Sequence, residues 1–289
     1  MKRIRVDLQD HILGVGKQKA YKYDIDTLPH DPKLPAVFVF SGNRGSGKTY
    51  ACVSLCQNFE KKHYTTRTFL LCPTRESNPL FEELHTLSKE DTCENSTHFL
   101  LFLRHVLSEI KKDWQAYTFE KMYTALYTKW KKGCPFLTLK EEKVLELRQG
   151  HPPQHLSKPS HMIIVDDAQS TSLFSNAREN VMSHIVIKHR HIPTSICFLM
   201  QSWMGLPRTI RLNGTHFLLY KTQDLKQVRQ LYEAFGNLVT WDQFLNMYKT
   251  ATSTPHGFLY IDTVPKQEAH RFKNGFNEYM MPPTEEEKG

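Results

Sequence analysis

The chain has 289 residues, a formal net charge of +8 and a hydrophobic content of 39%. No apolar run approaches membrane-spanning length, and the basic N-terminus lacks the apolar core of a signal peptide, so we expect a soluble intracellular protein without membrane insertion. No Gly/Ser-rich or low-complexity linker divides the sequence, which favours one enlarged domain over two. The basic balance fits an acidic partner such as nucleic acid, although a solvated basic face would give the same charge.

Residues 1–35 are mixed and polar, and the first core element expected after them is a strand over 36–40. Directly behind it, "GNRGSGKT" matches the P-loop pattern G-x-x-x-x-G-K-[ST]. Glycines let such a loop curl until its N–H groups point at phosphate oxygens, and the helix expected over 49–62 adds its positive N-terminal end. A chance glycine-rich turn would need neither the strand nor the helix. We therefore predict a nucleoside triphosphate site formed by Gly42, Asn43, Arg44, Gly45, Ser46, Gly47, Lys48 and Thr49.

Two P-loop residues have predicted roles of their own. Lys48 is expected to reach the β- and γ-phosphates, and Thr49 to place its hydroxyl on Mg²⁺. Behind them, Cys52 and Cys56 lie one helical turn apart and are expected to face the core as small apolar side chains. No pair among the six cysteines has the spacing of a zinc site.

The next stretch of the chain is predicted to be mainly helical. A strand over 67–74 ends near Pro73, and the helices that follow it are expected over 78–88, 98–117, 119–133 and 138–150. The basic and aromatic clusters "KKDW" and "KWKKG" suit a surface that tracks a nucleic-acid backbone, or else the solvated face of a helical hairpin. We treat residues from about 91 to 160 as a helical insertion.

A second motif follows the loop over 151–160. "HMIIVDDAQS" reads as a buried strand that ends in Asp166 and Asp167, the Walker B pattern. Such a strand delivers its first acid to the Mg²⁺ shell, and a second carboxylate beside it can polarise the attacking water. We therefore expect Asp166 to hold the metal and Asp167 to be catalytic, which favours a water-activating NTPase.

After a helix expected over 176–190, "PTSICFLMQSW" reads as a strand beside the Asp166 strand. It ends in Gln201, which can sense the γ-phosphate or can be an ordinary polar residue at a strand end. Arg190 precedes the strand and could reach a nucleotide in a neighbouring subunit, as an arginine finger does, or could be a surface arginine. Arg211 is a second candidate for that role.

The last elements complete an alternation of strands and helices. Strands are expected over 215–223 and 256–265, and helices over 224–236 and 240–250. Short, continuously apolar strands that alternate with helices predict an α/β fold, with a mostly parallel central sheet flanked by helices. The ligand is then expected at the carboxyl ends of the strands. We expect the domain to span 36–270 and an acidic C-terminal tail to span 271–289.

These segments together resemble the poxvirus-type DNA-packaging ATPases, which belong to the FtsK–HerA class of P-loop translocases. The resemblance rests on the P-loop, "FLLCPT", "IIVDDA", "HRHIPTSICFLMQS" and "LPRTIRLNGTHF", and it covers roughly residues 36–236. It implies a RecA-like P-loop fold in a ring-shaped homo-oligomer that hydrolyses ATP and drives double-stranded DNA into a preformed capsid.

Carried onto this chain, the resemblance implies the same roles for Asp166, Asp167 and Gln201, and an arginine finger at Arg190. The catalytic acid is Asp, where many translocases of this class have Glu. The partners implied are double-stranded DNA and viral capsid or portal proteins, in a host nucleus or cytoplasmic virus factory and in association with the virion. A nucleoside or nucleotide kinase and a nucleotide-gated DNA-binding scaffold are the alternative functions.

Overall fold

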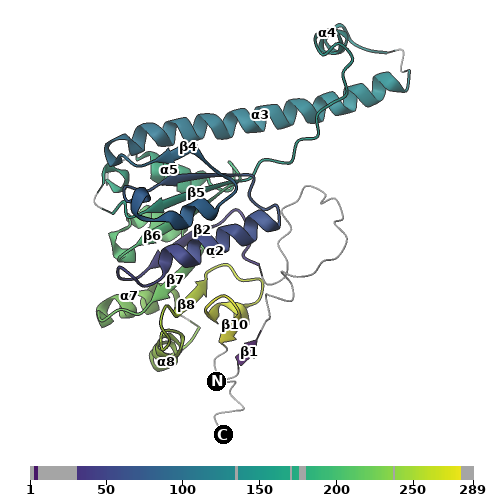
Figure 1. Cartoon of the computed structure of the whole chain (residues 1–289). Helices are drawn as coiled ribbons and strands as arrows, with labels where there is room; N and C mark the ends of the chain where they lie inside the picture. The colour runs from purple at the N-terminus through teal and green to yellow at the C-terminus, as the bar shows by residue number, and fades with distance from the viewer. Residues whose placement is uncertain are drawn as a thin grey trace. The chain divides into compact units, whose positions relative to one another are not determined.

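The computed structural model describes residues 3–5, 31–133, 136–169, 171–175, 180–236 and 238–280. The chain divides into two compact units, which we call the sheet unit (residues 1–104 and 160–289) and the helical unit (residues 105–159). Figure 1 shows the elements of both units. Each unit is described by itself below.

Ten strands of the sheet unit form one sheet, in the order β1-β10-β9-β8-β7-β2-β6-β5-β3-β4. Six neighbouring strands, from β7 to β4, pair in parallel. These strands are β2 (Val37–Ser41), β3 (Arg67–Leu71), β4 (Leu87–Cys93), β5 (His161–Asp166), β6 (Thr194–Met200) and β7 (His216–Tyr220). Every residue of β2, β5, β6 and β7 is buried, which is why these segments read as continuous apolar runs. The predicted α/β class with a mostly parallel sheet is confirmed.

One face of the sheet packs on helix α2 (Lys48–Lys61). Alternate residues of the central strands, among them Phe38, Ile164 and Cys197, share a buried cluster with the inner side of this helix. Because successive side chains of a strand point to opposite faces, the intervening residues face the other side. There, the ring of Phe217 packs against the tilted ring of Phe235 of α7 (Leu225–Phe235), with 4.3 Å between the ring centroids. The parallel core is therefore covered on both faces.

Three further helices belong to the sheet unit. They are α5 (Val181–Lys188), α6 (Arg208–Asn213) and α8 (Trp241–Ala251). The helix predicted over 176–190 thus matches α5 in part, and its first residues, 176–179, lie outside the described residues. The short helix α6 was not predicted.

Antiparallel strands extend the sheet beyond β7. β8 (Phe258–Asp262), β9 (Phe272–Asn274) and β10 (Glu278–Met280) follow in order, and β1 (Arg3–Arg5) pairs with β10. The sequence prediction placed 271–289 in a tail, but β9 and β10 carry the sheet to Met280. Both strands are only three residues long, too short for an alternating pattern to be recognised.

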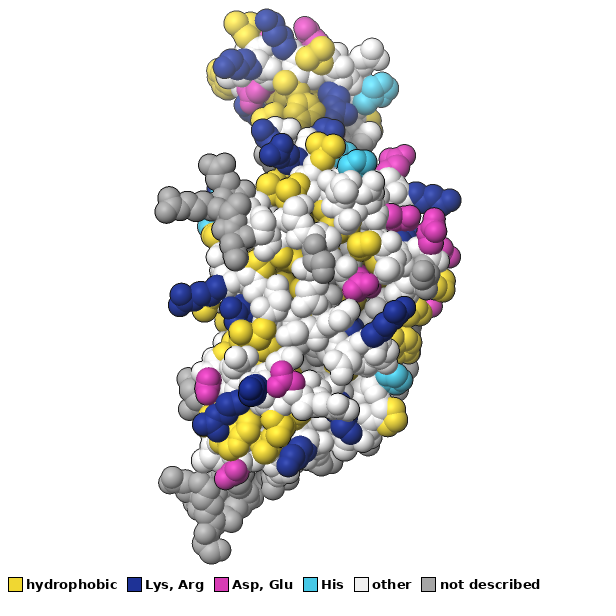
Figure 2. Space-filling view, turned by 90° about the vertical axis from the view of Figure 1, so that its left-hand side faces the viewer, with side chains coloured by type: hydrophobic (Ala, Val, Ile, Leu, Met, Phe, Trp, Pro, Cys, Tyr) yellow, Lys and Arg dark blue, Asp and Glu magenta, His cyan; other side chains and the backbone are white. Residues whose placement is uncertain are grey.

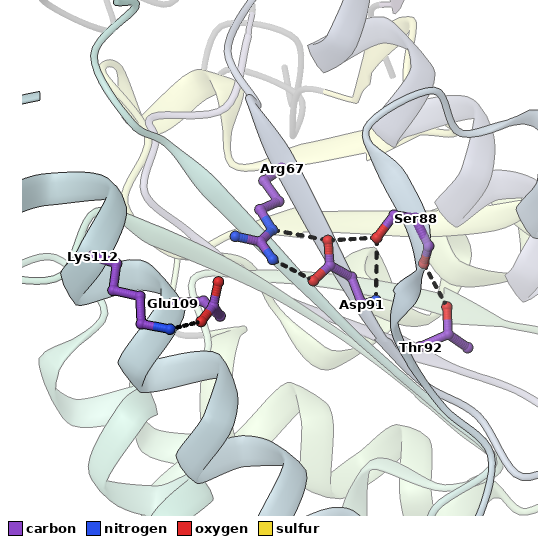
Figure 3. Close-up of polar contacts among 6 residues, drawn as sticks. All are labelled: Arg67, Ser88, Asp91, Thr92, Glu109 and Lys112. Atoms are coloured by element: carbon purple, nitrogen blue, oxygen red, sulfur yellow. Dashed lines mark hydrogen bonds and ion pairs between the residues drawn. The ribbon is translucent and has the colours of Figure 1, made fainter. Parts of the chain in front are cut away.

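At the opposite edge, the helix predicted over 78–88 is wrong. The chain forms a short 3₁₀ turn over Pro79–Glu83 and then strand β4. β4 has the polar sequence "LSKEDTC", which is typical of an edge strand. Because it contains no apolar run, the sequence pattern did not predict it. Arg67 of β3 holds it through two bonds to Asp91, Nε to Oδ2 at 2.8 Å and Nη2 to Oδ1 at 2.7 Å (Figure 3). Ser88 also donates to Asp91 Oδ2 at 2.9 Å.

The helical unit is built around α3 (Phe99–Lys131), which begins in the sheet unit. The two helices predicted over 98–117 and 119–133 are therefore one. α4 (Leu139–Leu147) begins with a capping box between Thr138 and Glu141, and its Leu145 packs on Tyr123 and Leu126 of α3. Arg148 pairs with Glu120. None of the helices in the described part of the chain is apolar over a stretch long enough to cross a bilayer.

Candidate nucleotide-binding site

Three neighbouring strands bring the predicted site residues together at the carboxyl ends of the strands. β2 lies beside β6, with Ser41 opposite Met200, and β6 lies beside β5, with Leu199 opposite Asp166. The strands are parallel, so the loops that follow Ser41, Asp166 and Met200 leave the sheet side by side. This juxtaposition places the P-loop, the acid pair and Gln201 together.

The P-loop adopts backbone angles that require glycine. Gly45 has a φ of +75° and Gly47 a φ of +93°, both in the left-handed region. Gly42 is needed for a different reason, since a Cβ atom there would lie 2.5 Å from Cβ of Tyr220. The loop closes on itself through a bond from Ser46 N–H to the Asn43 carbonyl at 3.2 Å.

Lys48 lies across the mouth of this loop. Its Nζ donates to the carbonyl oxygens of Gly42 at 2.8 Å and Asn43 at 2.9 Å. Burial lowers the pKa of Lys48, and the charges of Asp166 and Asp167 oppose that shift. The ammonium is thus desolvated and held beside the loop, where a phosphate oxygen could replace a carbonyl as its acceptor.

Two observations indicate that the P-loop suits an anion. The N-terminus of α2 has no side-chain cap and no acidic residue in its first turn, so its first N–H groups are not satisfied by the helix or by a neighbouring side chain. In addition, Ser46 Oγ is buried and has no hydrogen-bond partner among the described residues. Donors without acceptors at a helix N-terminus are what a phosphate group binds.

Thr49 and Asp166 meet at the start of α2. The Thr49 hydroxyl donates to Asp166 Oδ2 at 3.4 Å. Burial, and to a lesser degree the neighbouring charge of Asp167, raise the pKa of Asp166 to about 6. A cation at this point would relieve both effects, and oxygen ligands of this kind are those that Mg²⁺ prefers. The residues therefore fit the magnesium site expected from the sequence.

Asp167 and Gln201 line one cavity of about 510 Å³ together with Asn43 of the P-loop. Asp167 is exposed, and its backbone lies in the left-handed region, at a φ of +51°. That turn sends the chain away from the strand end immediately after Asp166. As a result the two adjacent acids have different environments, one buried against Thr49 and one open to the cavity.

Three residues of the same cavity were not predicted. They are Gln169, Ser202 and Gln227. Gln169 accepts from Gln201 N–H at 3.3 Å, and the Ser202 hydroxyl bonds to Gln227 Oε1 at 3.0 Å. Gln227 comes from α7, so only the fold reveals its position, whereas the location of Gln169 three residues after Asp166 was a usable signal in the sequence.

The two candidate arginines have different surroundings. Arg190 is exposed in the turn between α5 and β6, at the amino end of β6, and has no ion-pair partner in the described part of the chain. Arg211 lies on α6 with its guanidinium 5.2 Å from the ring centroid of Trp203 and its Nη1 3.0 Å from Met204 Sδ. Arg211 thus contacts side chains of the preceding turn, although its Nε has no hydrogen-bond partner among the described residues, and Arg190 is exposed to solvent.

No protein-family model matches the chain, and no match to a curated protein was found. Among solved structures, the chain is similar to B204, the DNA-packaging ATPase from Sulfolobus turreted icosahedral virus, at 11% identity and a TM-score of 0.49 over 86% of this chain and 98% of that one. It is also similar to the EccC ATPases 2 and 3 of Thermomonospora curvata, at 11% identity and a TM-score of 0.44 over 86% of this chain and 37% of that one.

Proposed function

We propose that this chain is an ATPase that drives double-stranded DNA into a preformed viral capsid. The main support for ATP hydrolysis is one observation. The P-loop, the Thr49–Asp166 pair and the exposed Asp167 converge at the carboxyl ends of the parallel strands. The DNA-translocating part is supported by the net charge of +8 and by the resemblance of the segment around "LPRTIRLN" to packaging ATPases.

Each residue has a role that its position supports. The P-loop amides and Lys48 would hold the phosphates, with Lys48 exchanging its carbonyl partners for phosphate oxygens. Thr49 and Asp166 would hold Mg²⁺, which when bound neutralises charge on the phosphate oxygens. Asp167 would accept the proton of the attacking water, and Gln201, in the same cavity, would sense the γ-phosphate.

The partners follow from the proposed activity. A motor of this kind acts as a homo-oligomeric ring around DNA, docked on capsid or portal proteins, in the host nucleus or a cytoplasmic virus factory. Arg190 would complete the site of the neighbouring subunit in that ring.

The test is an ATPase assay without any phosphate acceptor, with and without double-stranded DNA. We expect turnover that DNA accelerates, and mass photometry should show larger assemblies when ATP is present. Turnover only with a nucleoside or nucleotide acceptor would indicate a kinase instead, and ATP binding without turnover would indicate a scaffold.

Two variants test the site itself. Lys48→Ala should lower turnover at least about 100-fold, because an electrostatic contact to the reacting phosphates is lost. Asp167→Asn should retain ATP binding and lose about 100-fold or more in turnover, because the water loses its base. Lys61→Ala, on an exposed lysine of the same helix, is the matched control and should behave as the wild type.

A further inference from the structure

Three cysteine thiols converge behind the phosphate-binding helix. Cys52 and Cys56 lie on the inner side of α2 at a spacing of four residues, and Cys197 faces them from β6. Their sulfur atoms all lie within 4.8 Å of one another, and each residue is at most 1% exposed. Among the described residues, no other group of three or more His, Cys, Asp or Glu side chains converges in this way. We call these three residues the thiol cluster.

A fourth sulfur adjoins the thiol cluster. Cys197 Sγ donates to the thioether sulfur of Met162, on β5, at 3.7 Å. Helical periodicity predicts that Cys52 and Cys56 share one face of α2, but the sequence gives no sign that Cys197 and Met162 meet them, since both come from strands more than one hundred residues later. Spacing rules for metal sites therefore miss the cluster.

The spacing of the sulfurs suits a single bound ion. Around a centre bonded to sulfur at about 2.3 Å, three sulfur ligands lie about 3.8 to 4.0 Å apart. The thiols already lie within 4.8 Å of one another, so small rotations of the side chains would bring all three into range. Thiolates and thioethers are soft donors that favour Cu⁺ and related ions over Mg²⁺ or Ca²⁺.

The surroundings determine the charge that the ion can have. Phe38, Leu199, Leu218 and other apolar side chains enclose the thiol cluster, and a net charge buried there would be costly. Burial raises the pKa of the Cys52 and Cys197 thiols, because a thiolate is poorly solvated in such surroundings. The apolar enclosure therefore favours an ion of low charge, which needs fewer thiolates to be neutralised.

We propose that the thiol cluster is a binding site for one soft monovalent cation of the Cu⁺ class, held by Cys52, Cys56 and Cys197 with Met162 as an additional donor. A 1+ ion needs only one thiolate to reach neutrality. A 2+ ion such as Zn²⁺ would have to expel a second proton from a buried thiol to reach neutrality. The bound ion would join α2, which carries Lys48 and Thr49, to the strand that leads to Gln201.

The test is an anaerobic titration of the reduced full-length protein with Cu⁺, in competition with a chromophoric Cu⁺ chelator. The mixture is held until its absorbance is constant, because buried thiols exchange only through local opening. We expect one Cu⁺ per chain and a rise of several degrees in the melting temperature. The alanine variants of Cys52, Cys56 and Cys197 should each bind at least tenfold more weakly, and Cys93→Ala, outside the cluster, should bind as the wild type.

Two further measurements keep the proposal falsifiable if an alanine variant fails to fold. X-ray absorption at the copper edge of the wild-type complex should show three or four sulfur neighbours, and Met162→Leu, which conserves volume, should weaken binding without unfolding the protein. Coordination by nitrogen and oxygen alone, an unchanged affinity in folded cysteine variants, or no binding by the wild type would each overturn the proposal. None of these readouts requires ATP hydrolysis.

Discussion

Asp166 carries a charge that the protein alone does not favour. Its carboxylate is buried beside Asp167, and burial is the larger of the two effects that raise its pKa to about 6. The folded-state pKa is above the unfolded value, so the folded state binds the proton more tightly than the unfolded chain does. The free energy of unfolding therefore falls as pH rises from about 4 to about 6. Above about pH 6 the loss of stability caused by ionising Asp166 has reached its full value.

This cost predicts that Asp166→Asn stabilises the protein when no Mg²⁺ or ATP is present. We expect a gain of up to about 3 kcal/mol in the free energy of unfolding at pH 7.5, because a shift of about two pKa units is relieved. At pH 4 the gain should nearly vanish, since the wild-type carboxyl is then largely protonated. Urea unfolding at the two pH values measures the difference, and an equal change at both would contradict the assignment. Mg²⁺ with ATP should stabilise the wild type more than the variant.

The residues around Asp166 show which parts of the site a sequence can predict. The P-loop and the acid pair are contiguous motifs, so Lys48, Thr49 and Asp166 could be named from spacing alone, and the structure brings them together. Gln227 and Tyr220 could not, since one reaches the cavity from a helix and the other only limits the space beside Gly42. Their positions depend on which strands are neighbours.

Strand β6 separates Arg190 from Gln201. It runs from Thr194 to Met200, with Arg190 just before it and Gln201 just after it. Seven residues at about 3.3 Å each separate the two ends by about 23 Å. Gln201 lies in the cavity with Asp167. Arg190 therefore cannot reach the phosphates bound by its own chain, and we expect it to act on those of a neighbour.

This geometry predicts complementation between two inactive variants. Arg190→Ala should bind ATP nearly normally and lose about a thousandfold or more in turnover, because charge on the transferring phosphoryl group is no longer stabilised. When it is mixed with Lys48→Ala, a site with intact Lys48 can receive Arg190 from its neighbour, so part of the activity should return. Native mass spectrometry should confirm that the rings contain both variants. If such mixed rings show no ATPase activity, Arg190 does not act on a neighbouring subunit, and Arg211 becomes the candidate.

Among the elements, the buried ones were predicted well and the edge ones poorly. β5 and β6 are buried throughout and mostly apolar, and the expected strands contain both. β4 was not predicted, and only its first two residues fall in the helix expected over 78–88 from the helical spacing of "NPLFEELHTLS". Its pairing with β3 is supported by the Arg67–Asp91 ion pair. An ion pair between distant residues leaves no periodic signal in the chain.

At the scale of the whole molecule, the helical unit offers a basic and aromatic surface. Lys131 lies 5.1 Å from the ring centroid of Trp130 and 5.6 Å from that of Tyr127, and Lys132 beside it is exposed. Figure 2 shows Lys and Arg side chains interspersed with hydrophobic ones on the face that it draws. Such a surface suits contact with a phosphate backbone.

We predict that the double variant Lys131→Ala/Lys132→Ala weakens DNA binding without changing ATPase activity in the absence of DNA. Each lost phosphate contact should reduce the slope of log affinity against log salt concentration by about 0.9, so a decrease of about 1 to 2 is expected. Fluorescence anisotropy over a salt series measures it. Lys226→Ala/Lys249→Ala, on exposed lysines of the sheet unit, is the matched control. If both double variants lose affinity alike, the helical unit has no special part in DNA binding.

The central position of β2 has a consequence for synthesis on the ribosome. β2 lies between β6 and β7, and two backbone N–H groups at its start donate to side-chain hydroxyls 159 and 178 positions away, Ala36 to Ser195 Oγ and Val37 to Thr215 Oγ1. Contacts so distant along the chain form slowly, and β2 cannot have a neighbouring strand on both sides until β7 has left the exit tunnel. The P-loop is therefore synthesised well before the strands that hold β2 in the sheet. A nascent chain stalled before residue 216 should fail to retain ATP, while the contiguous helical unit is already complete.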